Sequence, residues 1–119
     1  MQSFLKAFAG RFWEDRWNKT GGLFPVYGVP AGSTGFVLAS LQKVMTEVPI
    51  LVVTPGAVSA EALALDLELF LKPDEFTLIP EKDGIPYDRA RRDAAIAGQR
   101  VHGILDLCEN RSGLYIAPV

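Results

Sequence analysis

The sequence predicts an α/β fold, a three-layer sandwich in which helices cover a mostly parallel sheet of about four strands. Short apolar runs alternate with segments of helical periodicity along residues 23–119, the alternation that parallel sheets require. The run ILVV at residues 50–53 is continuous and mostly β-branched, as in a strand that is covered on both faces. Right-handed crossovers between such strands place helices on both sides of the sheet.

An amphipathic helix is expected over residues 3–18, ahead of the sandwich. Phe4, Phe8 and Phe12 recur every four residues, and a second apolar row that includes Trp13 runs beside them. Such an aromatic stripe packs against a sheet or a neighbouring domain, or it lies on a membrane surface. Acidic and basic residues are mixed on the polar face, so attraction to anionic lipid is weak and packing is favoured. We therefore divide the chain into an N-terminal helix, residues 1–22, and an α/β domain, residues 23–119.

The α/β domain is expected to contain strands and helices in strict alternation. The apolar runs that predict strands are residues 23–29, 50–53, 76–79 and 114–119. The segments with helical periodicity are residues 33–47, 57–71 and 92–109. Each helix has an apolar row that we assign to the core: Val37, Leu41, Val44 and Val48 in the first; Ala60, Leu63, Leu67, Phe70 and Leu71 in the second; Ala97, Val101, Ile104, Leu105 and Cys108 in the third. The chain ends directly after an apolar run, so we expect it to be a piece of a longer protein.

Composition and charge exclude several classes of protein. The 119 residues carry 12 Lys and Arg against 14 Asp and Glu, a net charge of −2, whereas a domain that binds nucleic acid through phosphates is clearly basic. A single cysteine and a single histidine leave no internal disulfide and nearly exclude a zinc site. No apolar stretch approaches the ~18 residues of a membrane span, and charges interrupt the N-terminal segment where a signal peptide would lie. We expect a cytoplasmic protein.

The segment YGVPAGSTG at residues 27–35 lies where a phosphate-binding loop would, between a predicted strand and a predicted helix. That motif requires Gly, four residues, and then Gly-Lys-Ser/Thr. Counted from Gly28, Ser33 replaces the second glycine, Thr34 replaces the lysine, and Gly35 replaces the hydroxyl residue. The charge that meets the β- and γ-phosphates and a magnesium ligand are therefore both missing. We interpret the segment as a degenerate, P-loop NTPase-like loop whose glycines serve its geometry, with weak anion binding by backbone amides as the alternative. Its key residues are Gly28, Gly32, Ser33 and Thr34.

No other group of residues in the sequence forms an active site. His102, within the last predicted helix, is interpreted as a packing or surface residue. Arg89, Arg91 and Arg92 either contact a phosphate or carboxylate of a partner or are solvated beside nearby acids. The acids near one helix end are interpreted as a solvated face: Asp66, Glu68, Asp74 and Glu75. We therefore predict no catalytic residue, no metal ligand and no cofactor for this fragment, with the three arginines as a candidate partner contact.

Several segments of the sequence match the pattern of one known family. The most specific are GIPYDR at residues 84–89, similar to a Leu-Pro-Tyr-Asp-Arg segment, and the helix with Gln-Arg-Val at residues 99–101 that follows it. ILVVTP at residues 50–55 and GLYIAPV at residues 113–119 match two strands, and residues 27–33 match a degenerate nucleotide loop. Together they resemble the N-terminal, UvrB-like domain of the bacterial transcription-repair coupling factor (Mfd) family over residues 23–119. The sequence departs from that family at residues 90–94, where ARRDA replaces Ser-Pro-x-x-Glu.

The resemblance implies a role as well as a fold. The N-terminal module of the family is similar to the first domain of the excision-repair protein UvrB but has lost ATP binding, in agreement with the missing lysine. The full-length protein is an ATP-dependent DNA translocase that displaces stalled RNA polymerase and recruits UvrA. Its ATP- and magnesium-dependent motor, its polymerase-binding region and its main UvrA-contacting domain lie beyond residue 119. The implied function is a non-catalytic scaffold whose direct partners are neighbouring domains of the same chain, with UvrA, RNA polymerase and double-stranded DNA as partners of the whole protein.

Two other hypotheses stand beside this one. An active nucleotide-binding ATPase domain of UvrB or helicase type would be stabilised by nucleotide, but Thr34 at the lysine position argues against it. A stand-alone binding module of flavodoxin or receiver type is the other. A receiver requires an acidic pocket at the strand ends, and Thr54, Pro55 and Pro80 occupy those ends here.

Overall fold

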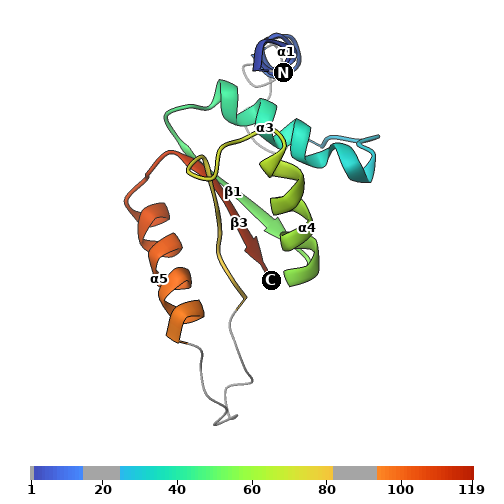
Figure 1. Ribbon diagram of the computed structural model, residues 1–119. Coiled ribbons are helices and arrows are strands. Elements are labelled where there is room, and N and C mark those ends of the chain that lie inside the picture. The colour runs from blue at the N-terminus through green and yellow to red at the C-terminus, as the bar shows by residue number, and fades with distance from the viewer. Residues whose placement is uncertain (1, 15–24, 82–93) are drawn as a thin grey trace.

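The computed structural model describes residues 2–14, 25–81 and 94–119 of the chain (Figure 1). Its helices are α1 (Gln2–Ala9), continued by the π-helical turn η1 (Gly10–Glu14), the 3₁₀ turn η2 (Ala31–Ser33), α3 (Thr34–Val44), α4 (Ala57–Glu68) and α5 (Ala94–Cys108). Its strands are β1 (Pro49–Thr54), β2 (Phe76–Leu78) and β3 (Gly113–Pro118). No helix in these ranges is both long and apolar enough to span a membrane.

The strands form a three-stranded parallel sheet in the order β1-β3-β2. The last strand in the chain is central, with Ile116 of β3 opposite Val52 of β1 and Leu78 of β2. The connection through α4 passes over β3, and the connection through α5 returns in the opposite direction. Right-handed crossovers in opposite directions place α4 and α5 on opposite faces of the sheet, as Figure 1 shows. The predicted α/β fold with a parallel sheet is therefore confirmed.

The first predicted strand, residues 23–29, is wrong over the part that the structure describes. Residues 25–29 pair with no strand, and Val26 and Tyr27 are exposed to 38% and 87%. Pro25 has no N–H to donate to a neighbouring strand, and Gly28 adopts a positive φ of 74°, which interrupts the extended backbone. The sheet has three described strands where the sequence predicts four, because these two residues break up a run that is apolar enough for a strand.

The main core lies between α4 and the sheet. Leu67 of α4 and Leu114 and Ile116 of β3 are completely buried, and Leu5 of α1 joins them. The row predicted to be the inner face of the second helix is confirmed, since its members are buried or packed against this core. A buried aliphatic side chain contributes about 1.5–3 kcal/mol of apolar burial, so this cluster is the main source of stability.

The opposite face of the sheet is covered only in part by α5, and not by the predicted row. Leu51 and Val53 of β1 are 50% and 57% exposed, so the expectation that the run at residues 50–53 is covered on both faces is wrong. Gly103 of α5 is buried against the side chains of Thr77 and Ile79, and Arg100 donates a hydrogen bond of 2.8 Å to the carbonyl oxygen of Pro80. The residues assigned to the core from periodicity all lie at the surface: Ala97, Val101, Ile104, Leu105 and Cys108. The prediction was wrong because Gly103 has no side chain, which lets α5 approach Thr77 and Ile79 on the side of the helix opposite to the predicted row.

Helix α3 lies between α1 and α4 rather than on the sheet. Its fully buried side chains are Ala39 and Ser40, not the row of valines and Leu41 predicted for the core, and Val48 of that row is 42% exposed. Trp13 donates an indole hydrogen bond of 2.9 Å to the Ser40 hydroxyl. The N-terminal aromatic stripe packs on α3 rather than on a sheet or a neighbouring domain. Phe4 and Phe8 both contact the ring of Phe36 in α3, and Phe4 stays 65% exposed.

A close contact between α3 and α4 requires glycine at position 35. A Cβ atom at Gly35 would lie 2.9 Å from the Asp66 Cβ and 3.1 Å from its carbonyl carbon. The sequence predicts a role in the loop geometry for both Gly28 and Gly32. Gly28 has a positive φ, which favours glycine. Gly32 has an ordinary φ and open space around it, so the backbone does not require glycine there.

We expect Gly35→Ala to destabilise the protein and Gly32→Ala to leave it nearly unchanged. Alanine normally stabilises a helix relative to glycine, but here the backbone of α4 must move away from the new methyl group. Overpacking of this kind costs about 1–3 kcal/mol, which lowers the Tm of a small domain by several degrees. Thermal unfolding followed by circular dichroism measures both variants, and equal Tm values would contradict the close contact.

Candidate functional site

The loop before α3 does not reach the edge of the sheet where phosphate loops lie. In parallel α/β sheets, ligands bind outside the carboxyl ends of the strands. Helix α3 instead crosses the amino ends, as Figure 1 shows, with its C-terminal half against Glu75, the residue that precedes β2. Gly35, next to Thr34 in the first turn of α3, lies against Asp66 near the C-terminal end of α4.

Two local features of the same segment also differ from those of a phosphate-binding loop. The N–H of Ser33 donates to the carbonyl of Pro30 at 2.9 Å, so one amide of the loop is already used. At position 35, where the motif has a magnesium-binding Ser or Thr, the contact with Asp66 leaves no room for a side chain.

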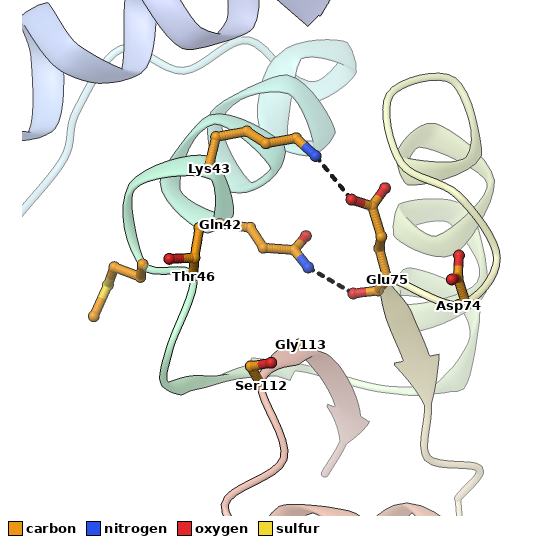
Figure 2. A pocket seen from close by; sticks show the side chains of 8 residues that line it. Gln42, Lys43, Thr46, Asp74, Glu75, Ser112 and Gly113 are labelled. Atoms are coloured by element: carbon orange, nitrogen blue, oxygen red, sulfur yellow. Dashed lines mark hydrogen bonds and ion pairs between the residues drawn. The ribbon is translucent and has the colours of Figure 1, made fainter.

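A polar pocket of about 250 Å³ lies at the amino end of the sheet, and Figure 2 shows it from close by. It is lined by Gln42, Lys43, Met45, Thr46, Asp74, Glu75, Ser112 and Gly113. The pocket is formed where the C-terminal end of α3 meets the residues that lead into β2 and β3. Its lining is polar, and its charged members are Lys43, Asp74 and Glu75.

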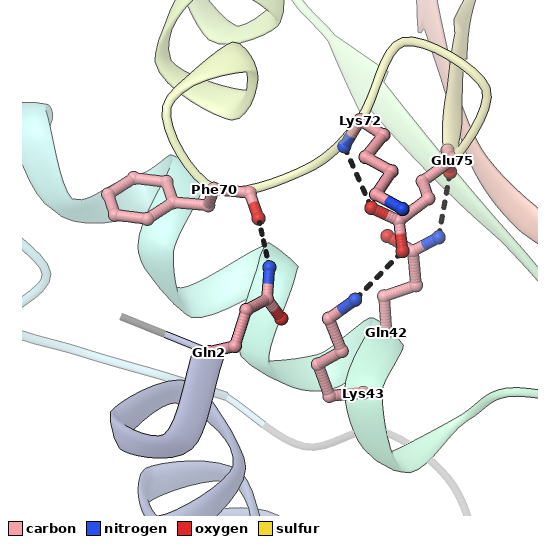
Figure 3. Close-up of polar contacts among 6 residues, drawn as sticks. All are labelled: Gln2, Gln42, Lys43, Phe70, Lys72 and Glu75. Carbon is pink, nitrogen blue, oxygen red and sulfur yellow. Dashed lines mark hydrogen bonds and ion pairs between the residues drawn. The ribbon is translucent and has the colours of Figure 1, made fainter.

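One side of this pocket is a group of interactions around Glu75, which we call the Glu75 junction. The Lys43 ammonium contacts the Glu75 carboxylate at 2.8 Å, and the backbone N–H of Lys72 donates to the other carboxylate oxygen at 2.7 Å (Figure 3). The Glu75 carbonyl accepts 2.7 Å and 3.2 Å hydrogen bonds from the Gln42 amide and the Leu114 N–H. The junction therefore ties α3, the loop after α4, and β3 to one residue.

The charges of the Glu75 junction neutralise one another. Burial raises the pKa of the Glu75 carboxyl, but the hydrogen bonds from Lys43 and the Lys72 backbone, with the positive charges of both lysines, outweigh it and lower the pKa below its ordinary value. Glu75 is therefore ionised at neutral pH. The interpretation of Glu75 as part of a solvated face was wrong, because its side chain is 28% exposed and paired. No local signal in the sequence could reveal this pair, whose members are 32 residues apart.

A second charged group lies at the end of α5. Asp106 contacts His102 at 3.4 Å and Arg111 at 3.2 Å, while the Tyr115 hydroxyl donates to the Arg111 carbonyl at 2.9 Å. Burial, with the negative charge of Asp106, raises the pKa of Tyr115 above its ordinary value. His102 is 74% exposed at its side chain, in line with the predicted surface residue. This group connects the helix end to the start of β3.

Other predicted sites are placed differently. Arg89, Arg91 and Arg92 lie outside the described residues. Across the ranges that the structure describes, no three His, Cys, Asp or Glu side chains gather as metal ligands would. Cys108, expected in the core, is exposed.

Sequence reasoning missed an apolar surface on the outside of α4. Val58, Leu65 and Leu69 are exposed to 81%, 65% and 71%. The signal was present, because the helix sequence AVSAEALALDLE is apolar in almost every direction, and such a helix is normally buried all round.

We expect Glu75→Gln to lower the stability of the protein and to flatten its dependence on acid pH. Because the folded-state pKa of Glu75 lies below the ordinary 4.5, its stabilisation is present above pH 4.5 and is lost as the pH falls through the folded-state value. Unfolding by urea between pH 3 and pH 7, in steps of about one unit, measures this. Glu109→Gln is the matched control, since the Glu109–Arg111 pair is more than half exposed on both sides and contributes little. Equal pH profiles for wild type and Glu75→Gln would contradict the role of the junction.

Comparison with known proteins identifies no relative of this chain. No family model, no curated protein and no solved structure matches the chain. The likeness to the coupling-factor family therefore rests on the residues quoted above.

Proposed function

We propose that this chain is a non-catalytic scaffold module, of the kind found at the N-terminus of the transcription-repair coupling factor family. The single observation that supports it best is that no lysine of α3 is available to the loop. Thr34 stands where a nucleotide loop has its lysine, and the next lysine along the chain, Lys43, is paired with Glu75 at the far end of α3. The loop thus has no side-chain cation from α3 to bind a phosphate.

The contact between Gly35 and Asp66 supports the same proposal. A phosphate loop needs a hydroxyl side chain at this position to bind magnesium, and a Cβ atom alone would already meet the backbone of α4. Restoring the motif would therefore require a change in how α3 packs. In this proposal, a direct contact between α3 and α4 occupies the place of the magnesium-binding side chain. Such a contact fixes the two helices relative to each other, as a scaffold requires.

In this proposal, the domain works by position and shape. Its rigid core of α4 and the sheet would hold neighbouring domains of the same chain, and ATP and magnesium would act only in the motor domains of the parent protein. UvrA, RNA polymerase and double-stranded DNA would be partners of that whole protein. The PYDR and QRV segments, with the flanking strands, are the sequence features that support this family over other α/β modules.

We expect millimolar Mg-ATP to leave the Tm of the protein unchanged. A ligand at ~100 times its Kd stabilises by about 2.7 kcal/mol, which is a shift of several degrees for a domain of this size. The measurement is the Tm from thermal unfolding with and without Mg-ATP, and with ADP and sulfate as further ligands.

A matched variant separates loop binding from general ionic effects. Ser33→Asp adds a carboxylate to the loop and removes any anion binding there, so a shift shared by both proteins does not come from the loop. A nucleotide shift in the wild type that Ser33→Asp abolishes would overturn the scaffold proposal and favour an ATPase domain of UvrB or helicase type.

A further inference from the structure

Helix α4 has two apolar rows, and only one of them serves the core. Ala60, Leu63 and Leu67 face the sheet and are exposed to 8% or less. The second row, which we call the outer row, is formed by Val58, Ala62, Leu65 and Leu69. Its three large side chains are each at least 65% exposed. A large apolar group at such exposure is ordinary when isolated, but an aligned row along a helix is typical of a docking surface.

The spacing of the outer row is that of a helix-pairing seam. Its residues follow one another at intervals of four, three and four, the pattern of the a and d positions of a heptad repeat. The helix is 12 residues long, which is about 18 Å, or roughly two heptads. A second helix packed along this row would insert its own side chains between these four.

Acidic residues border the outer row on both sides. Glu61 and Glu68 are exposed on one flank, three residues after Val58 and Leu65 respectively. Asp66, which is half-buried where α4 meets Gly35 of α3, lies on the other flank. The helix contains no Lys or Arg. The first cation after it in the sequence is Lys72, in the loop that leads to β2. The surface is thus an apolar seam with acidic borders.

The placement of these acids is unfavourable for the isolated helix. Carboxylates stabilise a helix near its N-terminus and destabilise it near its C-terminus, where the macrodipole is negative. In α4 the first turn has no acid and the last turn has no base, while Asp66 and Glu68 lie at the C-terminal end. A positively charged partner at this end would relieve the repulsion.

The acidic borders also exclude a second copy of the same helix as the occupant. In an antiparallel pair of α4 helices, Glu61 and Glu68 of one copy would face the same residues of the other. In a parallel pair, they would face the flank that carries Asp66. Both arrangements bring like charges together. The same carboxylates would repel an anionic lipid surface.

We propose that the outer row of α4 is a docking site for an amphipathic helix that bears Lys or Arg on both sides of its apolar row. The partner's leucine-type side chains would fill the seam of Val58, Leu65 and Leu69, and its cations would pair with Glu61 and Glu68. A single helix covers less area than the ~800 Å² per partner of a standard interface, so we expect micromolar rather than nanomolar affinity. This proposal does not depend on the family resemblance or on the absence of nucleotide binding.

Two synthetic peptides test the proposal with the whole chain. Both have three heptads with Leu at positions a and d; one has Lys at e and g, and the other has Glu there. Fluorescence anisotropy of labelled peptide, titrated with protein at about 50 mM salt, measures binding while charges are little screened. We expect the Lys peptide to bind at least about ten-fold more tightly than the Glu peptide, and its advantage to shrink at high salt.

Matched variants show where the peptide binds. Leu65→Glu should weaken binding of the Lys peptide about ten-fold or more, since it interrupts the seam. Leu105→Glu, an exposed leucine on α5, should leave it unchanged. The double variant Glu61→Lys with Glu68→Lys should reverse the preference toward the Glu peptide. All positions are exposed, so equal Tm values and circular dichroism spectra confirm that the variants fold.

Several outcomes would overturn the proposal. These are no binding of the Lys peptide at 200 µM protein or above (about 5 kcal/mol of binding free energy), equal binding of both peptides, or unchanged binding to Leu65→Glu. Dimerisation of the protein that Leu65→Glu abolishes would also overturn it, because a second copy would then be the occupant. The nucleotide experiment can fail or succeed independently of all of these.

Discussion

The burial of one row of α4 against the central strand is the interaction on which the rest of the structure depends. Leu67 meets Leu114 and Ile116, and all three are removed completely from solvent. Because β3 follows the other two described strands in the sequence and lies between them in the sheet, this contact joins residues as far apart as Leu67 and Ile116. It also orders the flanking strands, since β1 and β2 pair only with β3 among the described strands.

The position of α3 follows from this core and decides what the loop before it can do. Two contacts hold α3 across the amino ends of the strands: Gly35 against Asp66 at one end, and the Glu75 junction at the other. The first requires glycine where a nucleotide loop needs a hydroxyl, and the second engages Lys43, the first lysine after the loop in the sequence. The features that connect α3 to its neighbours are therefore the same features that argue against nucleotide binding.

The helices on the two faces of the sheet use their apolar residues differently. Helix α4 has enough of them to build the core and still expose a second row, whereas α5 meets the sheet through Gly103 and turns its larger apolar residues outward. The two exposed surfaces differ in the charged residues beside them. The three charged residues of α4 are all acidic, and α5 carries Arg100 and Asp106 with His102. Of these two surfaces, only that of α4 is bordered by charges of a single sign.

The sequence by itself determined the class of the fold and most of its elements. Continuous β-branched runs, helical periodicity and the prolines and glycines between them act locally, so three strands, the helices that alternate with them and the missing lysine at Thr34 were predictable. The tertiary structure alone decided which sides of α3 and α5 are buried. Gly103 lets α5 approach Thr77 and Ile79, and Gly35 lets α3 approach Asp66, and neither partner is visible in the local sequence. The same holds for Lys43 and Glu75, which meet because α3 lies across the amino ends of the strands. Periodicity identifies an apolar row, but the surface that it meets is set by contacts between distant residues, and this is why the outer row of α4 and the exposed row of α5 emerge only in the folded chain.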